Sequence, residues 1–279
     1  AWSCVIIEVF MYMLHGWLGD PVVPGWITPT LPFTLAYLNG FEKGPDRIQA
    51  MIALQLLVAF VFIFMGITKL ADKFVNGVPN SIKGGILIAA PITVLQGQLS
   101  DGSQLMTAPV ATLAGTLLLA FLSFSPFCEK NRSKYKILDI MAKYGNLFPY
   151  LIAMVAGVAL GELSKPVLEL GTVIRIPDFS NIFHTVSIFA VGFPPLSKFI
   201  SAIPLALICY VLAFGDFVTS KTLVEEAQES RSDEYIDFNS SRSNLISGLR
   251  NLILAIFAPF PPLAGPLWVG MTVSVAMRY

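Results

Sequence analysis

Two apolar stretches of this chain, residues 22–38 and 260–276, contain too many Pro and Gly residues to form continuous helices. The first reads VVPGWITPTLPFTLAYL and the second reads FPPLAGPLWVGMTVSVA, each with a Pro/Gly break beside a Trp and an apolar run after it. Backbone at membrane depth can leave the helical pattern only where it is buried in protein or lines a wet cavity. Paired interrupted segments therefore predict a transporter with a solute site between them.

The composition is that of a protein embedded in a lipid bilayer. Hydrophobic residues make up 55% of the chain and charged residues 13%, whereas soluble domains carry about 25% charged residues. We therefore expect a multi-pass integral membrane protein of a plasma or inner membrane. The net charge is zero and Lys and Arg are scattered, so a nucleic-acid partner is not expected. The three Cys residues show no metal-type spacing, and no cofactor or metal is expected.

Nine apolar segments follow one another along the chain. They cover residues 1–17, 22–38, 47–70, 80–98, 104–125, 146–163, 197–217, 246–259 and 263–277. A helix needs about 20 apolar residues to cross the hydrocarbon core, so the short segments are expected to tilt, break or pack inside. Because strand periodicity is absent, the sequence predicts an all-α membrane protein.

Positive charge sets the orientation of these segments. Residues 127–146 carry five Lys or Arg residues, whereas the longer connection 164–195 carries only Lys165 and Arg175. The first connection is therefore expected on the cytoplasmic side. Residues 71–79 and 219–244 must share that side, and we interpret 219–244 as a solvated cytoplasmic linker.

Three runs of the sequence resemble parts of one transporter family. IPDFSNIFHTVSIFAVGFPPLSKFISAIPLALICYVLAFGDFVTSKTL, residues 176–223, resembles the long outer connection and next helix of the nucleobase-ascorbate (uracil/xanthine permease) transporters. Residues 241–279 are similar to the family's next short helix, Gly/Pro-rich break and half-helix, and residues 67–92 resemble its helix-loop-helix. The sulfate permease relatives share this architecture.

The resemblance implies a fold of two inverted seven-span repeats with a core domain and a gate domain. The nine segments would be the second to tenth of fourteen spans, so we expect the chain to be part of a longer protein. Residues 1–125 would hold first-repeat spans, 126–146 a basic cytoplasmic loop, 147–196 the seventh span and outer connection, and 197–279 the start of the second repeat. Dimers are common in these families, so we expect a homodimer by analogy with them.

Two acidic groups typical of the nucleobase carriers are missing. The family usually places a Glu three positions before the Gly that aligns with Gly215, where this chain has Leu212. A second carboxylate expected in the tenth segment falls near Trp268 or Val269. The loss of both favours an anionic solute held by backbone N–H groups, while a purine or pyrimidine stays an alternative.

The predicted solute site lies at the two breaks. If half-helices begin there, their first N–H groups carry partial positive charge toward a common mid-membrane cavity. The candidate contacts at the breaks are Trp26, Ile27, Thr28, Thr30, Gly265, Pro266, Leu267 and Trp268. The two Trp side chains are expected to stack on a planar solute or seal the pocket; alternatively, both lie at the bilayer interface.

Ionisable residues inside apolar segments are the other candidates. Asp216, in AFGDFVTSK, is a functional candidate, because placing an ionisable side chain inside a membrane costs free energy. The alternative is a carboxylate at the membrane interface that caps its helix or snorkels beside Lys221. Glu8 can pair with His15, two turns along the same segment. Arg250 stands close to the start of its segment, where it can snorkel to the surface.

Among function classes, a secondary active transporter fits these features best. It would move a small polar or anionic solute by alternating access, coupled to a proton or sodium ion. A passive channel is the alternative, although no filter or pore ring is visible. An enzyme is not expected, because the sequence has no metal spacing, phosphate loop or nucleophile motif.

Overall fold

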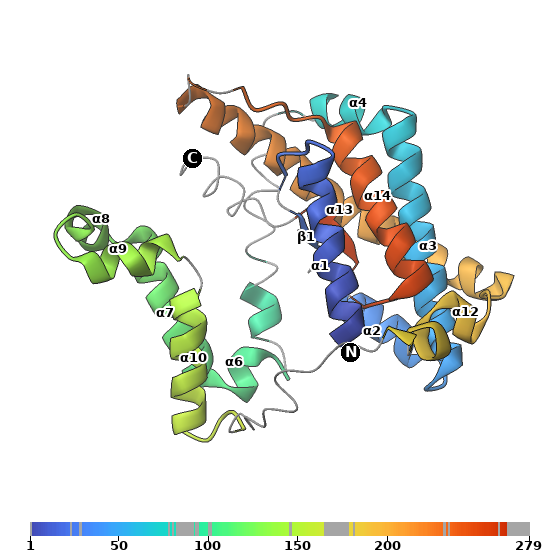
Figure 1. The fold of residues 1–279 in the computed structure, drawn as a ribbon, viewed down its shortest axis with the longest axis horizontal. Coiled ribbons are helices and arrows are strands. Elements are labelled where there is room, and N and C mark those ends of the chain that lie inside the picture. The colour runs from blue at the N-terminus through green and yellow to red at the C-terminus, as the bar shows by residue number, and fades with distance from the viewer. Residues whose placement is uncertain are drawn as a thin grey trace. The chain divides into compact units, whose positions relative to one another are not determined.

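In the part of the chain that the structure describes, the fold consists of helices (Figure 1) and one pair of very short strands. The computed structural model describes residues 2–22, 24–27, 30–77, 79, 81, 92, 95–99, 102–144, 147–164, 179–180, 182–230, 233, 235–261 and 263–266. The chain divides into two compact units, one formed by residues 1–89 and 176–279 and the other by residues 90–175. This division is based on contacts in space. The ranges expected from the sequence are based on transporter repeats, so the two divisions do not describe the same property.

The larger unit carries both interrupted segments. Its elements are α1 (Trp2–Trp17), β1 (Pro24–Trp26), α2 (Leu31–Asn39), α3 (Pro45–Ile67), α4 (Leu70–Gly77), the π-helical turn η2 (Ile182–Val186), α12 (Ile188–Val191), α13 (Leu196–Ser230), α14 (Ser240–Phe257) and β2 (Ala264–Pro266). The smaller unit contains α6 (Gln104–Thr107), α7 (Pro109–Phe124), α8 (Pro126–Asn131), α9 (Lys136–Lys143) and α10 (Leu147–Ala159).

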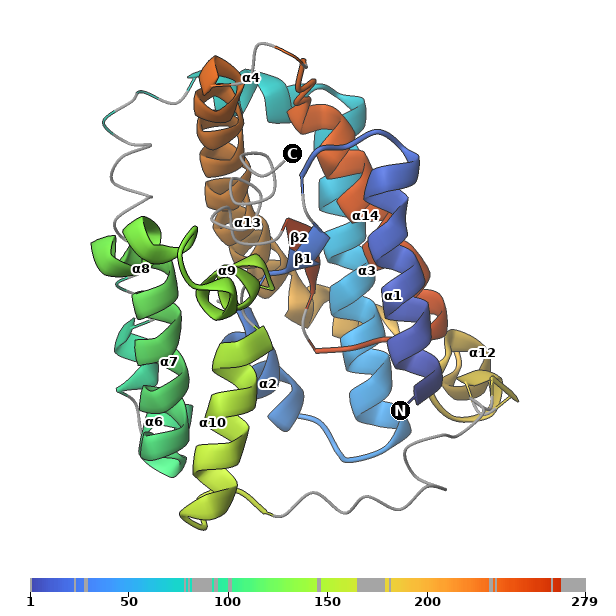
Figure 2. The same ribbon diagram turned by 60° about the vertical axis from the view of Figure 1, so that its left-hand side comes forward.

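Helix α3 forms the centre of the larger unit, with α13 and α14 packed against it (Figure 2). Pro45 at its start and Asp46 in its first turn are typical of a helix N-terminus. Its buried face meets α13 in the main hydrophobic core, where the ring of Phe62 lies 5.1 Å from that of Tyr210 and 6.0 Å from that of Phe217. Helix α3 (Pro45–Ile67) and residues Leu196–Glu229 of α13 are long and apolar enough to cross a membrane.

Glycines allow α14 to approach α3 closely. A Cβ atom on Gly248 would lie 2.6 Å from Cγ1 of Ile63 and 3.1 Å from the carbonyl oxygen of Ala59. On α3, a Cβ atom on Gly66 would lie 2.6 Å from Cγ of Leu245. Small residues at such crossings let helix backbones come together, so the contact between α3 and α14 depends on both glycines.

The two interrupted segments meet as an antiparallel pair of strands. Pro24 lies opposite Pro266, Gly25 opposite Gly265, and Trp26 opposite Ala264. Figure 2 shows the pair in the space between α13 and α3. The expected break before a helix is therefore present in the first segment, where β1 precedes α2. The helix expected after β2 lies outside the described residues.

The linker interpretation of residues 219–244 is wrong, because helices occupy both ends of that stretch. Helix α13 continues to Ser230, beyond the end of its apolar part, and Lys221 pairs with Glu225 one turn later at 3.5 Å. Helix α14 begins at Ser240, after Asn239 accepts a capping hydrogen bond from the Arg242 amide at 2.8 Å. Charged residues end the apolar segment, but they do not end the helix, because Glu and Lys are good helix formers.

The basic stretch 126–146 also contains regular structure, namely α8 and α9. In the same unit, α7 packs against α10. Glu162, which follows α10, accepts hydrogen bonds from the amides of Val110 and Ala111, each at 2.8 Å. These amides belong to the first turn of α7, so one carboxylate satisfies donors that have no partner within the helix.

We expect Gly248→Ala to destabilise the larger unit. The added methyl group would meet both a side chain and the backbone of α3, and overpacking of this kind costs about 1–3 kcal/mol in the free energy of unfolding. Thermal unfolding of the purified protein in detergent measures the effect. Gly16→Ala is the matched control in α1, since no described atom lies within 4 Å of a Cβ there and Ala favours helix; equal melting temperatures for the two variants would contradict the packing role.

Candidate functional site

The strand pair is the candidate site, because it gathers predicted residues from both ends of the sequence. Trp26 belongs to β1, and Gly265 and Pro266 belong to β2. The ladder continues one step beyond the strands, where the amide of Ile27 donates to the carbonyl of Leu263 at 2.9 Å. The predicted residues Thr28, Leu267 and Trp268 lie outside the described residues.

Glycine is required where the two strands lie opposite each other. A Cβ atom on Gly265 would come within 2.5 Å of Cγ1 of Ile27, which is closer than carbon atoms can approach. Ile27 is fully buried and packs with Leu263 in the core that α3 and α13 form. The glycine therefore serves close backbone approach, and Ile27 acts as a packing residue beneath it.

A single side chain from α14 holds both strands. Arg250 donates from Nη1 to the carbonyl of Gly265 and from Nη2 to the carbonyl of Gly25, each at 3.1 Å. Its exposed fraction is 0%. The expectation that Arg250 snorkels to the surface is therefore wrong: α14 begins at Ser240, so residue 250 lies in the middle of the helix. Sequence reasoning missed this residue as part of the site.

Asn251, the next residue of α14, extends β2 with its side-chain amide. Its Nδ2 donates to the carbonyl of Ala264 at 2.7 Å, and its Oδ1 accepts from the amide of Ala264 at 3.0 Å. The side chain thus reproduces the pairing of a neighbouring strand. An Arg-Asn pair in a short apolar helix just before a Pro/Gly break is the sequence signal that could have indicated both contacts.

Helix α1 covers the other side of β1. The indole N–H of Trp26 donates to Oε2 of Glu8 at 3.4 Å, and its ring lies 6.2 Å from the rings of Tyr12 and Phe260. The guanidinium of Arg250 lies over the Tyr12 ring, 4.9 Å from its centroid. Trp26 is 38% exposed and is placed against α1; its stacking on a solute stays a prediction.

The expected pair between Glu8 and His15 is not formed. Nδ1 of His15 instead lies 2.8 Å from Oδ2 of Asp20, and Oδ1 of Asp20 accepts from the hydroxyl of Ser243 on α14 at 2.7 Å. The reason is local: α1 ends at Trp17, and the loop turns Asp20 back beside His15. Nε2 of His15 faces Nη1 of Arg250 at 3.4 Å.

On the side of α2, hydroxyl groups surround the start of the half-helix. Thr30 is fully buried, and its hydroxyl donates to the carbonyl of Ile27 at 2.6 Å rather than capping α2. The first N–H groups of α2 have no partner within the helix. The buried hydroxyl of Thr34 likewise has no hydrogen-bond partner among the described residues. The Thr34 hydroxyl is thus a buried donor near the start of α2.

Asp216 lies on α13 and is half-buried. It stands two turns, roughly 10 Å, from Cys209, whose thiol bonds to Thr30, so both residues share one face of α13. No hydrogen bond or ion pair reaches the Asp216 carboxylate from the part of the chain that the structure describes. The capping alternative is wrong, because α13 continues to Ser230 and Lys221 bonds to Asn76 and Glu225 instead.

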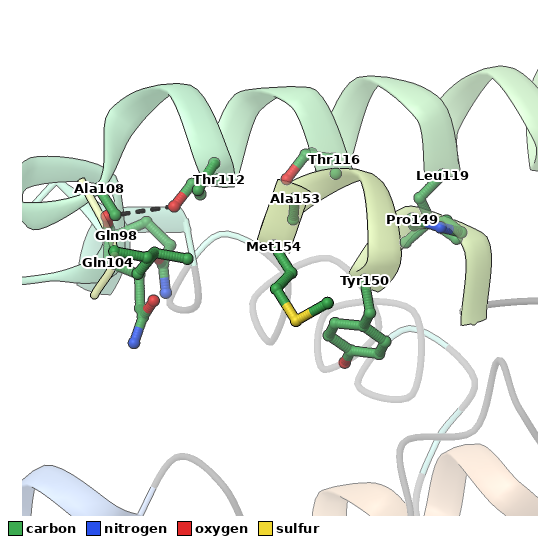
Figure 3. Close-up of a pocket in the computed structure, with 13 residues that line it drawn as sticks. Gln98, Gln104, Ala108, Thr112, Thr116, Leu119, Pro149, Tyr150, Ala153 and Met154 are labelled. Atoms are coloured by element: carbon green, nitrogen blue, oxygen red, sulfur yellow. Dashed lines mark hydrogen bonds between the residues drawn. The ribbon is translucent and has the colours of Figure 1, made fainter. Parts of the chain in front are cut away.

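Two cavities add residues that sequence reasoning missed. One of about 310 Å³ lies in the larger unit, where the corner between α2 and α3 brings Lys43 and Arg47 together with Pro259 and Pro261. The other, of about 650 Å³, lies in the smaller unit between α7 and α10. Figure 3 shows Gln104, Tyr150 and Met154 among its lining residues.

The described residues hold no group of three or more His, Cys, Asp or Glu side chains that could ligate a metal ion. Around the strand pair the structure places hydrogen-bonding groups and the ionisable side chains of Glu8 and Arg250, while Asp216 lies two turns along α13 from Cys209. Such a set can bind and release a polar molecule.

We expect Asn251→Asp to loosen β2 from α14. A carboxylate cannot donate to the carbonyl of Ala264 and would face it as a second acceptor, so a buried carbonyl loses its partner at a cost of about 1–3 kcal/mol. Hydrogen exchange of the peptide containing residues 263–266, measured by mass spectrometry, should become faster. In the control Asn131→Asp, on α8, exchange of that peptide should stay unchanged; unchanged exchange in both would contradict the clamp.

Comparison of the chain with known proteins does not supply a family. No family model matches the chain, and no curated protein matches it either.

Proposed function

We propose that the chain belongs to a secondary active transporter for a small polar or anionic solute. In this proposal it resembles the nucleobase-ascorbate transporters and their sulfate permease relatives, with two inverted seven-span repeats divided into core and gate domains. Alternating access takes place around a solute held between two half-helices in the membrane. A homodimer in a plasma or inner membrane completes the proposal.

The observation that carries the proposal is the antiparallel pairing of β1 with β2. Two Pro/Gly segments from opposite ends of the sequence leave the helical pattern and meet inside one helical unit. Irregular backbone at membrane depth is stable only where protein or a wet cavity satisfies it. Here α14 satisfies the carbonyls of both strands. In this proposal the N-terminus of α2, beyond β1, meets the solute.

Groups at several places in the larger unit favour a solute rich in acceptors. Helix N-termini attract negative charge through their unpaired N–H groups. The buried hydroxyl groups of Thr34 on α2 and Ser220 on α13 have no partner among the described residues. Lys43 and Arg47 place positive charge in the cavity at the corner of α2 and α3. In this proposal Asp216 meets an N–H group of the solute.

A ligand screen on the full-length protein tests the solute class. A molecule that binds only the folded state raises its apparent stability, so the melting temperature in detergent is measured with nucleobases, ascorbate and small oxyanions. Hits are then followed as uptake into proteoliposomes. Saturable uptake that is accelerated by unlabelled solute on the opposite side supports a transporter, whereas conductance without saturation or exchange supports the passive channel.

We expect Asp216→Asn to impair coupled uptake much more than folding. The amide keeps the size of the side chain but removes its negative charge, and no described residue forms a hydrogen bond with the carboxylate that folding would lose. Initial rates of gradient-driven uptake and the melting temperature are compared with those of Asp139→Asn, an exposed position on α9. Normal uptake by Asp216→Asn would make the carboxylate dispensable.

We expect Gly265→Val to abolish solute binding. A branched side chain would collide with Ile27 across the strand pair and displace β2. Loss of the thermal shift produced by a ligand from the screen measures the effect. The double variant Gly265→Ala with Ile27→Ala removes the colliding atoms and should regain part of the binding; undiminished affinity in Gly265→Val alone would count against the site.

A further inference from the structure

The side of the strand pair that faces α1 and α14 contains a cluster of ionisable groups, of which only Arg250 has been given a role. Glu8, Tyr12 and His15 share one face of α1, Asp20 follows in the loop, and Arg250 enters from α14. Glu8 and Asp20 are each 6% exposed, His15 is 1% exposed and Arg250 is 0% exposed. Ionisable groups in such surroundings are costly and are functional candidates by default.

The hydrogen bonds assign a protonation state to His15. An ionised Asp20 can only accept, so Nδ1 of His15 carries the hydrogen of their 2.8 Å contact. Nε2 then keeps its lone pair toward Nη1 of Arg250, a donor at 3.4 Å. A second proton on Nε2 would point one N–H at another. The imidazole is therefore neutral in this arrangement.

The charges of the cluster then balance only if one carboxyl group holds a proton. Arg250 contributes one positive charge, while ionised Asp20 and Glu8 would contribute two negative charges. Asp20 is engaged on both oxygens, by His15 on Oδ2 and by Ser243 and the amide of Val22 on Oδ1. Glu8 accepts on Oε2 from Trp26, but its buried Oε1 has no partner among the described residues. Oε1 of Glu8 is the atom at which a proton restores neutrality.

The other charged side chains that the structure describes on the elements around this cluster have partners or positions away from it. At the N-terminal end of α14, Arg242 pairs with Asp237 at 2.9 Å, and Asp72 on α4 accepts from Ser241. At the start of α3, Asp46 pairs with Lys198 and Arg47 donates to the carbonyl of Phe41. His184 lies on η2, whose Phe183 packs against Phe257 at the C-terminal end of α14. The strands β1 and β2 carry no ionisable side chain.

We propose that Glu8 is the proton-binding residue through which solute movement is coupled to a proton gradient. Protonation of Oε1 leaves Arg250 committed to the carbonyls of Gly25 and Gly265, which holds the strand pair together. Release of the proton creates a carboxylate that attracts Arg250 and competes with those carbonyls. The proton thus controls the clamp on the two strands that frame the solute site.

This inference rests on the proposed transport function, but the proton site has a readout of its own. The indole of Trp26 donates to Glu8, so its fluorescence reports the ionisation of that carboxyl group. In the full-length protein, Trp2, Trp17 and Trp268 are replaced by Phe, together with any Trp outside these residues, and the emission of Trp26 is followed against pH in liposomes. We expect a one-proton transition that disappears in Glu8→Gln, because the amide keeps an acceptor for the indole but does not titrate.

Transport measurements complete the test with uracil, ascorbate and sulfate as probes. In Glu8→Gln, uptake of the transported probe under an inward proton gradient should fall to the rate measured without a gradient, while its exchange across the membrane continues. Glu226→Gln, an exposed position on α13, is the control and should keep the full response to the gradient.

Persistence of the Trp26 transition in Glu8→Gln, its absence from the parent protein, or gradient-driven uptake that survives the substitution would each overturn the proposal. If the transition depends on Glu8 but none of the probes is taken up or exchanged, the proton site stands and the proposed transport of these solutes fails. The two failures are therefore distinguishable.

Discussion

The arrangement of the larger unit depends on one buried guanidinium. Arg250 satisfies the carbonyls of Gly25 and Gly265, which belong to strands of three residues each. A ladder that short is not stable by itself. A carbonyl group that is buried in the protein without a hydrogen-bond partner would cost several kcal/mol in the free energy of folding. A residue with a planar fork of donors reaches two acceptors at once, so one side chain of α14 can join segments that the sequence separates widely.

The strand pair also separates two environments. Ile27 and Leu263 pack into the apolar core formed with α3 and α13, whereas Ala264 packs with Leu254 of α14, with Ala258 just after that helix, and with residues of α1. On the other side, the buried hydroxyl groups of Thr30 and Thr34 lie at the start of α2, and the half-buried Asp216 lies on α13. Behind β1, α1 and α14 enclose the charged cluster. A solute on one side and a proton on the other would thus act on the same two strands, which is the requirement for coupling through a shared element.

Several parts of this organisation could be predicted from the sequence because they are encoded locally. Pro and Gly disfavour regular helix, so both breaks were visible, and the apolar segment 47–70 indicated a long helix. The end of α13 was not visible, because hydropathy records the end of an apolar surface and not the end of a helix. The pairing of His15 with Asp20 depends on how the chain turns after Trp17, which no periodicity describes.

The sequence by itself determined that this is a helical chain suited to a bilayer and that two Pro/Gly segments must leave the helical pattern. Only the tertiary structure decided that these segments pair as strands, that Arg250 and Asn251 join them to α14, and that Glu8 faces Trp26. The physical reason is that conformational restrictions act within a few residues of Pro and Gly, whereas the partner of a buried carbonyl or carboxylate is chosen by packing between elements far apart in the chain.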